Sequence, residues 1–250
     1  MKHNKKLNLT ALFIVIIMLV TIMIPFKSAV RAEALPAKGF KAISAACGHN
    51  LAIMEDGSLW AWGCNDQGQI GDGTTVDKEI PVKIMDNVKA ASAGGYDNAF
   101  LGDGGGFSLA VKEDGSLWAW GANNYKQLGK NEVWRRYSPT PIRIMDNVKS
   151  VAAGSNSCFV IKEDGSLWAW GGNKFGQLGD GTTEDRIEPV KIMTEVKAVF
   201  SGFERTYAIK EDGSLWGWGW NGSNDPGNRY YGEGYLGDGT VGEKLKPVKI

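Results

Sequence analysis

The chain has 250 residues, with 28 basic and 28 acidic side chains, three cysteines and two histidines. This balance argues against a nucleic-acid-binding protein, because binding to phosphate backbones requires clustered positive charge. The odd and sparse cysteine count argues against a small fold held together by disulfides.

The first 34 residues have the composition of a secretory signal peptide. Three lysines occur within the first six residues, Leu9–Ile24 is an almost unbroken apolar run, and Ala32–Ala34 is a small-x-small cleavage site. We therefore expect 1–34 to be removed and the protein to be secreted or held at the cell surface. The alternative is an uncleaved membrane anchor, since the apolar run is nearly long enough to span a bilayer. Pro25 and the cleavage site favour removal.

The remaining chain, 35–250, contains 23 basic and 27 acidic residues and has no basic run. We therefore expect no nucleic-acid partner, and membrane contact only through an uncleaved N-terminal segment.

A repeat dominates the rest of the sequence. The string EDGSLWAWG, with one Ala-to-Gly change in its last copy, occurs at 55–63, 113–121, 163–171 and 211–219. Its second tryptophan recurs after 58, 50 and 48 residues, a period typical of propeller blades or solenoid coils. Two further motifs recur in the same order. A turn-rich segment related to GQLGDGT lies at 68–74, 127–129, 176–182 and 236–240, and PVKI or PIRI lies at 81–84, 141–144, 189–192 and 247–250.

Asp-Gly between alternating apolar residues is a strong hairpin signal. It predicts hairpins at 49–63, 107–121, 157–171 and 205–219. A two-residue turn at Asp56-Gly57 would place Ile53 opposite Trp60 and Leu51 opposite Trp62. Because large side chains at repeated positions usually form the core of a repeat array, we expect the tryptophans to pack between blades. These are Trp60, Trp62, Trp118, Trp120, Trp168, Trp170, Trp216 and Trp218.

The order small-Ala-Gly-x-x-His-x-x-Ala-Leu, EDG, aromatic-x-WG-x-N, GQLG and Pro-x-x-Ile resembles the repeat of the regulator of chromosome condensation family. The resemblance covers 39–250 and implies an all-β fold of propeller blades, in a secreted bacterial-type member. Family propellers have seven blades, and this sequence holds about four repeats, so we expect either an open arc or, from a truncated chain, part of a seven-bladed ring. The histidine position of the family is filled only by His49, and its equivalents are Phe107, Ser157 and Arg205.

Three stretches depart from the repeat: Tyr96–Gly106, the KNEVWRRYS connection after Gly129, and Trp220–Tyr235. The first and third should rise from one rim of the propeller, opposite the Asp-Gly turns. Because Trp, Tyr and Arg dominate binding hot spots and loops usually carry recognition, we expect partner binding there. The candidate residues are Tyr96, Trp134, Arg135, Arg136, Tyr137, Trp220, Arg229, Tyr230, Tyr231 and Tyr235. The alternative is that these aromatics only cover blade edges.

A mixed group of zinc-ligand types is also present: the two-residue turn would place Cys47, His49, Cys64 and Asp66 on one face of a hairpin. Small-residue packing explains the cysteines equally well, because repeat three has Ser155 and Gly172 in their places. We therefore expect no metal and no cofactor.

Catalysis has little support, since 35–250 contains one histidine and lacks nucleophile-elbow, zinc-protease and phosphate-loop motifs. The resemblance implies a protein-interaction module, because a secreted bacterial relative, the β-lactamase-inhibitory propeller, binds its target enzyme through an aromatic-rich face. The alternatives are a carbohydrate or cell-wall binder and a guanine-nucleotide exchange factor. The signal peptide disfavours exchange, because it directs the chain away from cytosolic GTPases.

Overall fold

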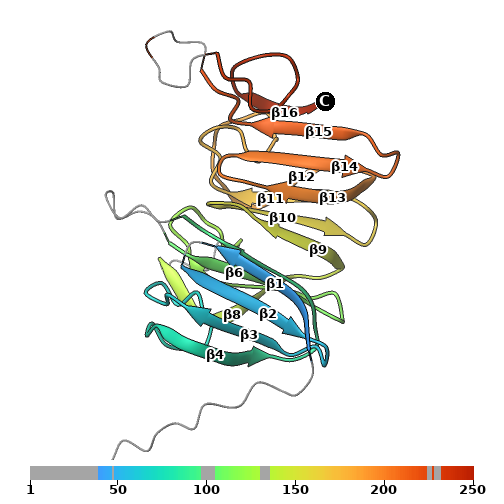
Figure 1. Cartoon of the computed structure of the whole chain (residues 1–250). Helices are drawn as coiled ribbons and strands as arrows, with labels where there is room; N and C mark the ends of the chain where they lie inside the picture. The colour runs from blue at the N-terminus through green and yellow to red at the C-terminus, as the bar shows by residue number, and fades with distance from the viewer. Residues whose placement is uncertain (1–38, 47, 97–104, 130–135, 224–226, 228–231) are drawn as a thin grey trace, which may run out of the picture. The chain divides into compact units, whose positions relative to one another are not determined.

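The computed structural model of the protein describes residues 39–46, 48–96, 105–129, 136–223, 227 and 232–250. The described residues form four four-stranded antiparallel sheets, each built from consecutive strands, so the expected all-β blades are confirmed (Figure 1). We call these sheets blades 1 to 4, in chain order. The predicted signal peptide lies outside the described residues. Within the described residues, the structure contains no helix with the length and apolar character needed to cross a bilayer.

The strands of blades 1 and 2 are β1 (Phe40–Ala46), β2 (His49–Met54), β3 (Leu59–Gly63), β4 (Lys78–Met85), β5 (Val88–Gly94), β6 (Phe107–Lys112), β7 (Leu117–Ala122) and β8 (Tyr137–Met145). Those of blades 3 and 4 are β9 (Val148–Ala153), β10 (Ser157–Lys162), β11 (Leu167–Gly171), β12 (Arg186–Met193), β13 (Val196–Ser201), β14 (Arg205–Lys210), β15 (Leu215–Gly219) and β16 (Lys244–Lys249).

The hairpin turns differ from the sequence prediction by one residue. Ala52 pairs with Trp60 and Leu51 with Ala61, so the connection is a three-residue loop, Glu55–Gly57. Gly57 alone in this loop has a positive φ, of 80°, as expected for a three-residue hairpin loop that ends in a left-handed residue. The Asp56 carboxylate accepts hydrogen bonds from the Ser58 backbone N–H (3.0 Å) and hydroxyl (2.6 Å), which fixes this longer loop. The predicted two-residue turn is therefore wrong.

This register divides each hairpin into two different faces. Because side chains alternate along a strand, Trp60 and Trp62 share a face with Ala52, while Leu51 and Ala61 lie on the other. The predicted opposition of tryptophan and large aliphatic side chains is therefore wrong. Each blade has a tryptophan face and an aliphatic face.

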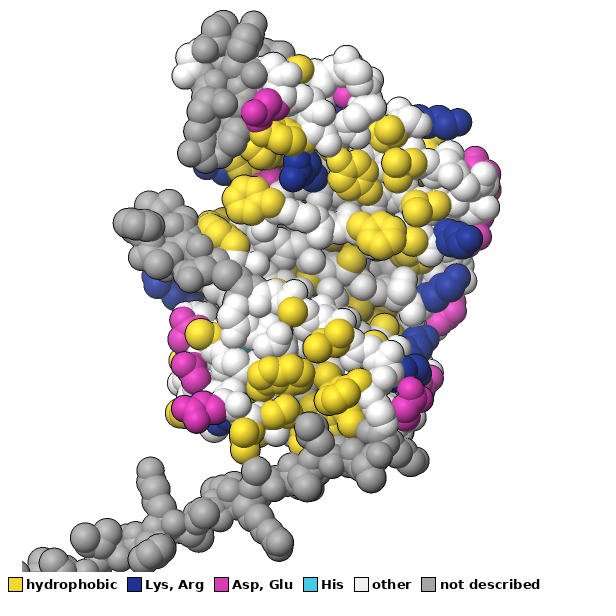
Figure 2. Space-filling view, in the orientation of Figure 1, with side chains coloured by type: hydrophobic (Ala, Val, Ile, Leu, Met, Phe, Trp, Pro, Cys, Tyr) yellow, Lys and Arg dark blue, Asp and Glu magenta, His cyan; other side chains and the backbone are white. Residues whose placement is uncertain are grey.

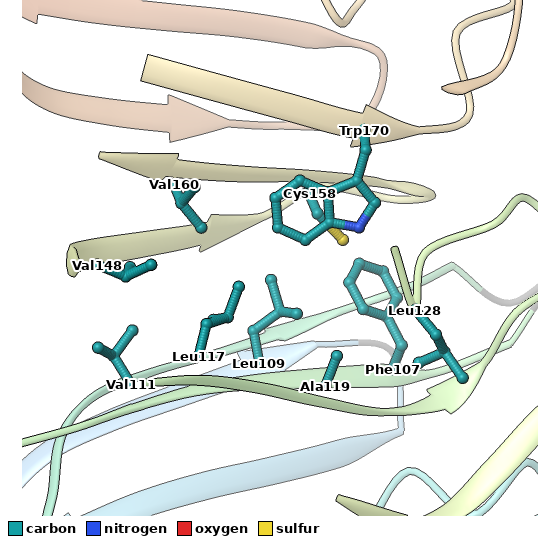
Figure 3. Packing of buried hydrophobic residues seen from close by; sticks show 10 residues of the cluster. All are labelled: Phe107, Leu109, Val111, Leu117, Ala119, Leu128, Val148, Cys158, Val160 and Trp170. Atoms are coloured by element: carbon teal, nitrogen blue, oxygen red, sulfur yellow. The ribbon is translucent and has the colours of Figure 1, made fainter. Parts of the chain in front are cut away.

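Blades pack by placing the aliphatic face of one against the tryptophan face of the next. Between blades 2 and 3, Leu109 and Ala119 lie against Val160 and Trp170, and all are fully buried (Figure 3). The same arrangement recurs between blades 1 and 2 and between blades 3 and 4. The second tryptophan of each following blade is 0% exposed at these joints: Trp120, Trp170 and Trp218.

The GQLG motif crosses from one blade to the next and holds that tryptophan. The indole N–H of Trp170 donates to the Gln127 carbonyl oxygen at 2.8 Å, and Trp218 donates to the Gln177 carbonyl at 2.8 Å. The last glycine of this motif lies directly on the indole: a Cβ built on Gly179 would come within 2.6 Å of Trp218 Nε1. Its φ of 80° also favours glycine.

The asparagine two residues after each WG pair organises the turn-rich loop that follows. The Asn173 amide donates to the Asp180 carboxylate and to the Thr182 and Glu184 carbonyls, and its oxygen accepts from the Leu178 N–H at 3.0 Å. Such side-chain bonds replace a backbone ladder and rigidify a loop. The turn-rich loop that follows each of these asparagines therefore has a fixed backbone.

Candidate functional site

The residues that border the two main insertions lie at the blade ends opposite the EDG loops. Tyr96 follows β5, whose last residue Gly94 pairs with Phe107 at the start of β6. Trp220 follows β15, whose last residue Gly219 pairs with Arg205 at the start of β14. We call this edge of the blades the rim.

A depression of about 250 Å³ lies at the rim, with lining residues from blades 2, 3 and 4. We call it the rim cleft. Its aromatic lining comes from Tyr96, Tyr125, Phe175 and Phe203. Its polar lining includes Asn156, Lys174, Gln177, Asp185 and Glu204.

The aromatic side chains of the rim cleft are partly fixed and partly open to solvent. The Tyr96 and Tyr125 hydroxyls lie 3.4 Å apart. Phe203 is 59% exposed, while its backbone carbonyl accepts a hydrogen bond from the Ser155 hydroxyl at 2.8 Å. Phe203 therefore presents an apolar ring to solvent from an anchored backbone. Figure 2 shows hydrophobic side chains in two groups on the face in view, one over blades 3 and 4 and another over blade 1.

A second aromatic group adjoins the cleft on blade 4. The Trp220 and Tyr235 rings are stacked, with centroids 5.0 Å apart, and Trp220 lies 6.4 Å from Phe175. The Arg205 guanidinium carbon lies 4.8 Å from the centre of the Tyr235 ring, and the Tyr207 hydroxyl donates to the Tyr235 carbonyl at 2.8 Å. The aromatic surface therefore continues from the cleft across blade 4.

Glu204 is a buried acid in the cleft wall, 9% exposed. Gln177 Nε2 donates a short hydrogen bond to Glu204 Oε2. Burial raises the pKa of Glu204 to about 7, although the charge of Lys174 and the bond from Gln177 lower that pKa in part, and the charge of Asp185 raises it further. Near neutral pH the ionised and protonated forms of Glu204 are therefore both populated.

The residues predicted for partner binding divide into three groups. Tyr96 lines the cleft, and Trp220 and Tyr235 lie beside it. Arg136 and Tyr137 are exposed where β8 begins and are not among the lining residues; the Arg136 carbonyl accepts from the Asn123 N–H at 2.7 Å. The others lie outside the described residues: Trp134, Arg135, Arg229, Tyr230 and Tyr231.

Sequence reasoning missed most of the cleft lining. Tyr125 and Phe175 occupy the same repeat position, which is Gln67 in blade 1. Glu204 occupies a position that is Gly106 in blade 2 and Asn156 in blade 3. A position-by-position comparison of the four repeats, rather than of their insertions alone, contains this signal.

The candidate zinc ligands are not arranged as the two-residue turn predicted. His49 pairs with Gly63 rather than with Cys64, and its Nε2 lies 2.9 Å from the Ser108 hydroxyl across the joint between blades 1 and 2. Asp66 accepts a hydrogen bond from Gln69 at 3.0 Å. Cys47 lies outside the described residues. In the part of the chain that the structure describes, no three His, Cys, Asp or Glu side chains are grouped to hold a metal ion.

His49 gives the protein a predicted acid sensitivity. It is fully buried, and burial lowers its pKa from 6.5 to about 4, with a smaller opposing effect from the Phe107 backbone. Between these pH values the unfolded chain binds a proton that the folded chain does not, so stability falls as pH falls from 6.5 towards 4, by about 3 kcal/mol. Urea unfolding across this range should show a flatter profile for His49→Gln than for the wild type. Identical profiles would contradict a buried neutral His49.

The family model described as "Regulator of chromosome condensation (RCC1) repeat" matches residues 56–101, 114–161 and 164–209. A second model with the same description matches residues 41–69, 148–177 and 196–224.

Among related proteins, the human E3 ubiquitin-protein ligase HERC2 is 31% identical over 127 residues, which are 48% of this chain and 2% of HERC2. The solved structure of human WBSCR16 has a TM-score of 0.70 at 23% identity and covers 86% of this chain and 53% of that one. Prp20p from Saccharomyces cerevisiae has a TM-score of 0.68 at 22% identity and covers 88% of this chain and 52% of that one. The chain thus spans about half of these structures, and at such identities the likeness establishes the fold.

Proposed function

Because the chain belongs to the regulator of chromosome condensation (RCC1) repeat family and is a repeat scaffold of the protein-interaction type, we propose that it is a non-catalytic module that binds a protein partner through its rim. The proposed partner surface consists of the rim cleft and the aromatic group beside it on blade 4. The proposed place of action is outside the cell, either in the medium or at the cell surface.

The observation that carries this proposal is the exposed aromatic cleft on a rigid frame. Phe203 is 59% exposed, yet it lies between β13 and β14 and its carbonyl is anchored by Ser155. Tyr125 and Phe175 lie in loops that an asparagine side chain holds in place. Its oxygen accepts a hydrogen bond from the backbone N–H of Leu128 in one loop and of Leu178 in the other. Aromatic side chains held this way lose little conformational entropy on binding, which is why such residues dominate hot spots.

Two further observations support the proposal. The N-terminal 34 residues have the composition of a signal peptide, which supports a role outside the cell. The structure of Prp20p was described together with that protein's binding to Gsp1p and histones, which supports protein interaction as a use of this fold.

The test is a capture experiment with the full chain and secreted or cell-surface proteins as prey, followed by binding measurements with the captured protein after purification. The double variant Tyr125→Ala/Phe203→Ala should weaken binding at least 30-fold, because aromatic hot-spot truncations each cost about 1 to 2 kcal/mol. Phe200→Ala is the matched control: it is the same residue type, 58% exposed, three residues away, and does not line the cleft.

Loss of binding in the double variant but not in the control would support the rim. Loss in Phe200→Ala alone would place the partner on the sheet face of blade 4 and overturn the proposal. Competition by soluble cell-wall polysaccharide, with no captured protein, would favour the carbohydrate alternative, since sugar rings stack on the same aromatics.

A further inference from the structure

We propose that the rim cleft binds a cationic side chain, a lysine or arginine of the partner protein, between its aromatic rings and the carboxylate of Glu204. This inference rests on the proposed function and deepens it, because it names the chemical group that the partner must present.

The first argument is that Glu204 is a buried acid without a cation at contact distance. In the described part of the chain every salt bridge joins other residues. Its hydrogen-bond partner there is Gln177 on Oε2, whereas Oε1 is accessible to solvent and is not among the buried atoms left without a partner. Acids are rarely buried unless they are paired, and an unpaired buried carboxylate weakens the fold. Its retention in a cleft wall is explained if the missing partner arrives from outside.

The second argument is the aromatic lining around this acid. Tyr125, Phe175 and Phe203 line the same cleft as Glu204, and the face of an aromatic ring attracts cations. Two aromatic rings at this rim already lie next to basic side chains of this protein. Lys174 Nζ lies 5.5 Å from the centre of the Phe175 ring, and Arg205 lies over Tyr235.

The third argument is size and charge. A volume of about 250 Å³ is below the usual range for cofactor or drug-sized ligands, which begins near ~300 Å³, and suits a single side chain. The ionisable groups that line the cleft are Glu204, Asp185 and Lys174, so acidic side chains outnumber basic ones by two to one. An anionic group would meet a repulsive wall, whereas a cation gains from both acids.

The direct test is an NMR titration of the full-length protein with each of two small probes. The first probe is Nα-acetyl-lysine methylamide, and the second is Nα-acetyl-norleucine methylamide, which has the same chain without the ammonium group. We expect the lysine probe to bind at least about 10-fold more tightly, because charge-assisted hydrogen bonds are the strong ones. Equal binding of the two probes, or no binding of either, would overturn the proposal.

Variants locate the effect. Glu204→Gln should weaken binding of the lysine probe by about 10-fold and leave the norleucine probe unchanged. Phe203→Ala should weaken the lysine probe by roughly 3-fold, as expected for the loss of one ring. Phe200→Ala is the control and should have no effect. An unchanged affinity in Glu204→Gln would remove the carboxylate from the site.

The pH dependence needs no variant and separates this role from a purely structural one. The lysine probe stays charged below pH 8, while Glu204, flanked by Lys174 and Asp185, gains its proton as the pH falls through about 7. Lowering the pH from 8 to 5.5 should therefore weaken binding in the wild type by up to about 10-fold, the loss expected for Glu204→Gln, and much less in that variant. A flat wild-type profile would contradict the proposal.

The two proposals fail in different ways. If a captured partner loses affinity with Tyr125→Ala/Phe203→Ala but not with Glu204→Gln, the rim is the interface and the cation site is wrong. If the lysine probe binds as expected and rim variants leave the captured partner bound, the cation site stands and the proposed partner surface is wrong.

Discussion

Gly179→Ala is expected to destabilise the protein by about 3 kcal/mol, through two effects that add. A residue with a Cβ loses about 1 to 2 kcal/mol in the left-handed conformation that Gly179 adopts, at φ 80°. The new Cβ would also lie 2.6 Å from Trp218 Nε1, in a joint where overpacking costs about 1 to 3 kcal/mol. Urea unfolding of the full chain measures the sum.

Gly213→Ala is the matched control for this prediction. Gly213 has nearly the same φ, 82°, and no heavy atom lies within 4 Å of the Cβ that alanine would add. The Gly213→Ala variant should therefore lose only about 1 to 2 kcal/mol of folding stability, from the backbone conformation alone. The difference between the two variants measures the contact with Trp218, and equal losses would mean that the joint relaxes around the extra methyl group.

Trp170→Ala is expected to give the largest loss, about 3 to 5 kcal/mol, because a fully buried large aromatic is removed from the joint between blades 2 and 3. In repeat proteins stability is a sum of blade and joint contributions, so weakening the middle joint should also broaden the transition or split it in two. Denaturation followed by both fluorescence and circular dichroism detects such a split.

Trp170→Phe separates packing from hydrogen bonding. Phenylalanine keeps most of the ring in the joint but cannot donate to the Gln127 carbonyl, which Trp170 does at 2.8 Å. We expect a loss of about 1 to 2 kcal/mol from this change, mainly from the missing donor and the smaller ring. A loss as large as that of Trp170→Ala would instead make the hydrogen bond the dominant part of the joint.

The fold was predictable because the same three motifs occur in the same order in four repeats. The period, the EDG loops and the two accompanying motifs identify the blades and their strands, and the strands begin and end at the predicted positions 49 and 63 in blade 1. The turn itself was misjudged, because Asp-Gly is typical of two-residue loops. The deciding contact, from Ser58 to the Asp56 carboxylate, favours a loop of three.

The candidate site was only partly predictable. Insertions pointed correctly to Tyr96 and Trp220 as neighbours of the rim, since chain topology places both strand ends on one edge. The cleft itself depends on contacts between loops of three blades, such as the bond from Gln177 to Glu204. A sequence pattern within one repeat cannot show which side chains meet across a joint, so Phe203 and Glu204 were missed.

The bond from the second tryptophan of blades 2, 3 and 4 to the glutamine carbonyl of the preceding blade has a consequence for how such chains change in length. The acceptor lies in one repeat and the donor in the next: Gln127 accepts from Trp170, and Gln177 accepts from Trp218. A duplicated copy of the unit, inserted in phase, would bring a matching acceptor for the blade after it and a matching donor for the blade before it. Blades can therefore be gained or lost by gene duplication and deletion without any new interface having to evolve.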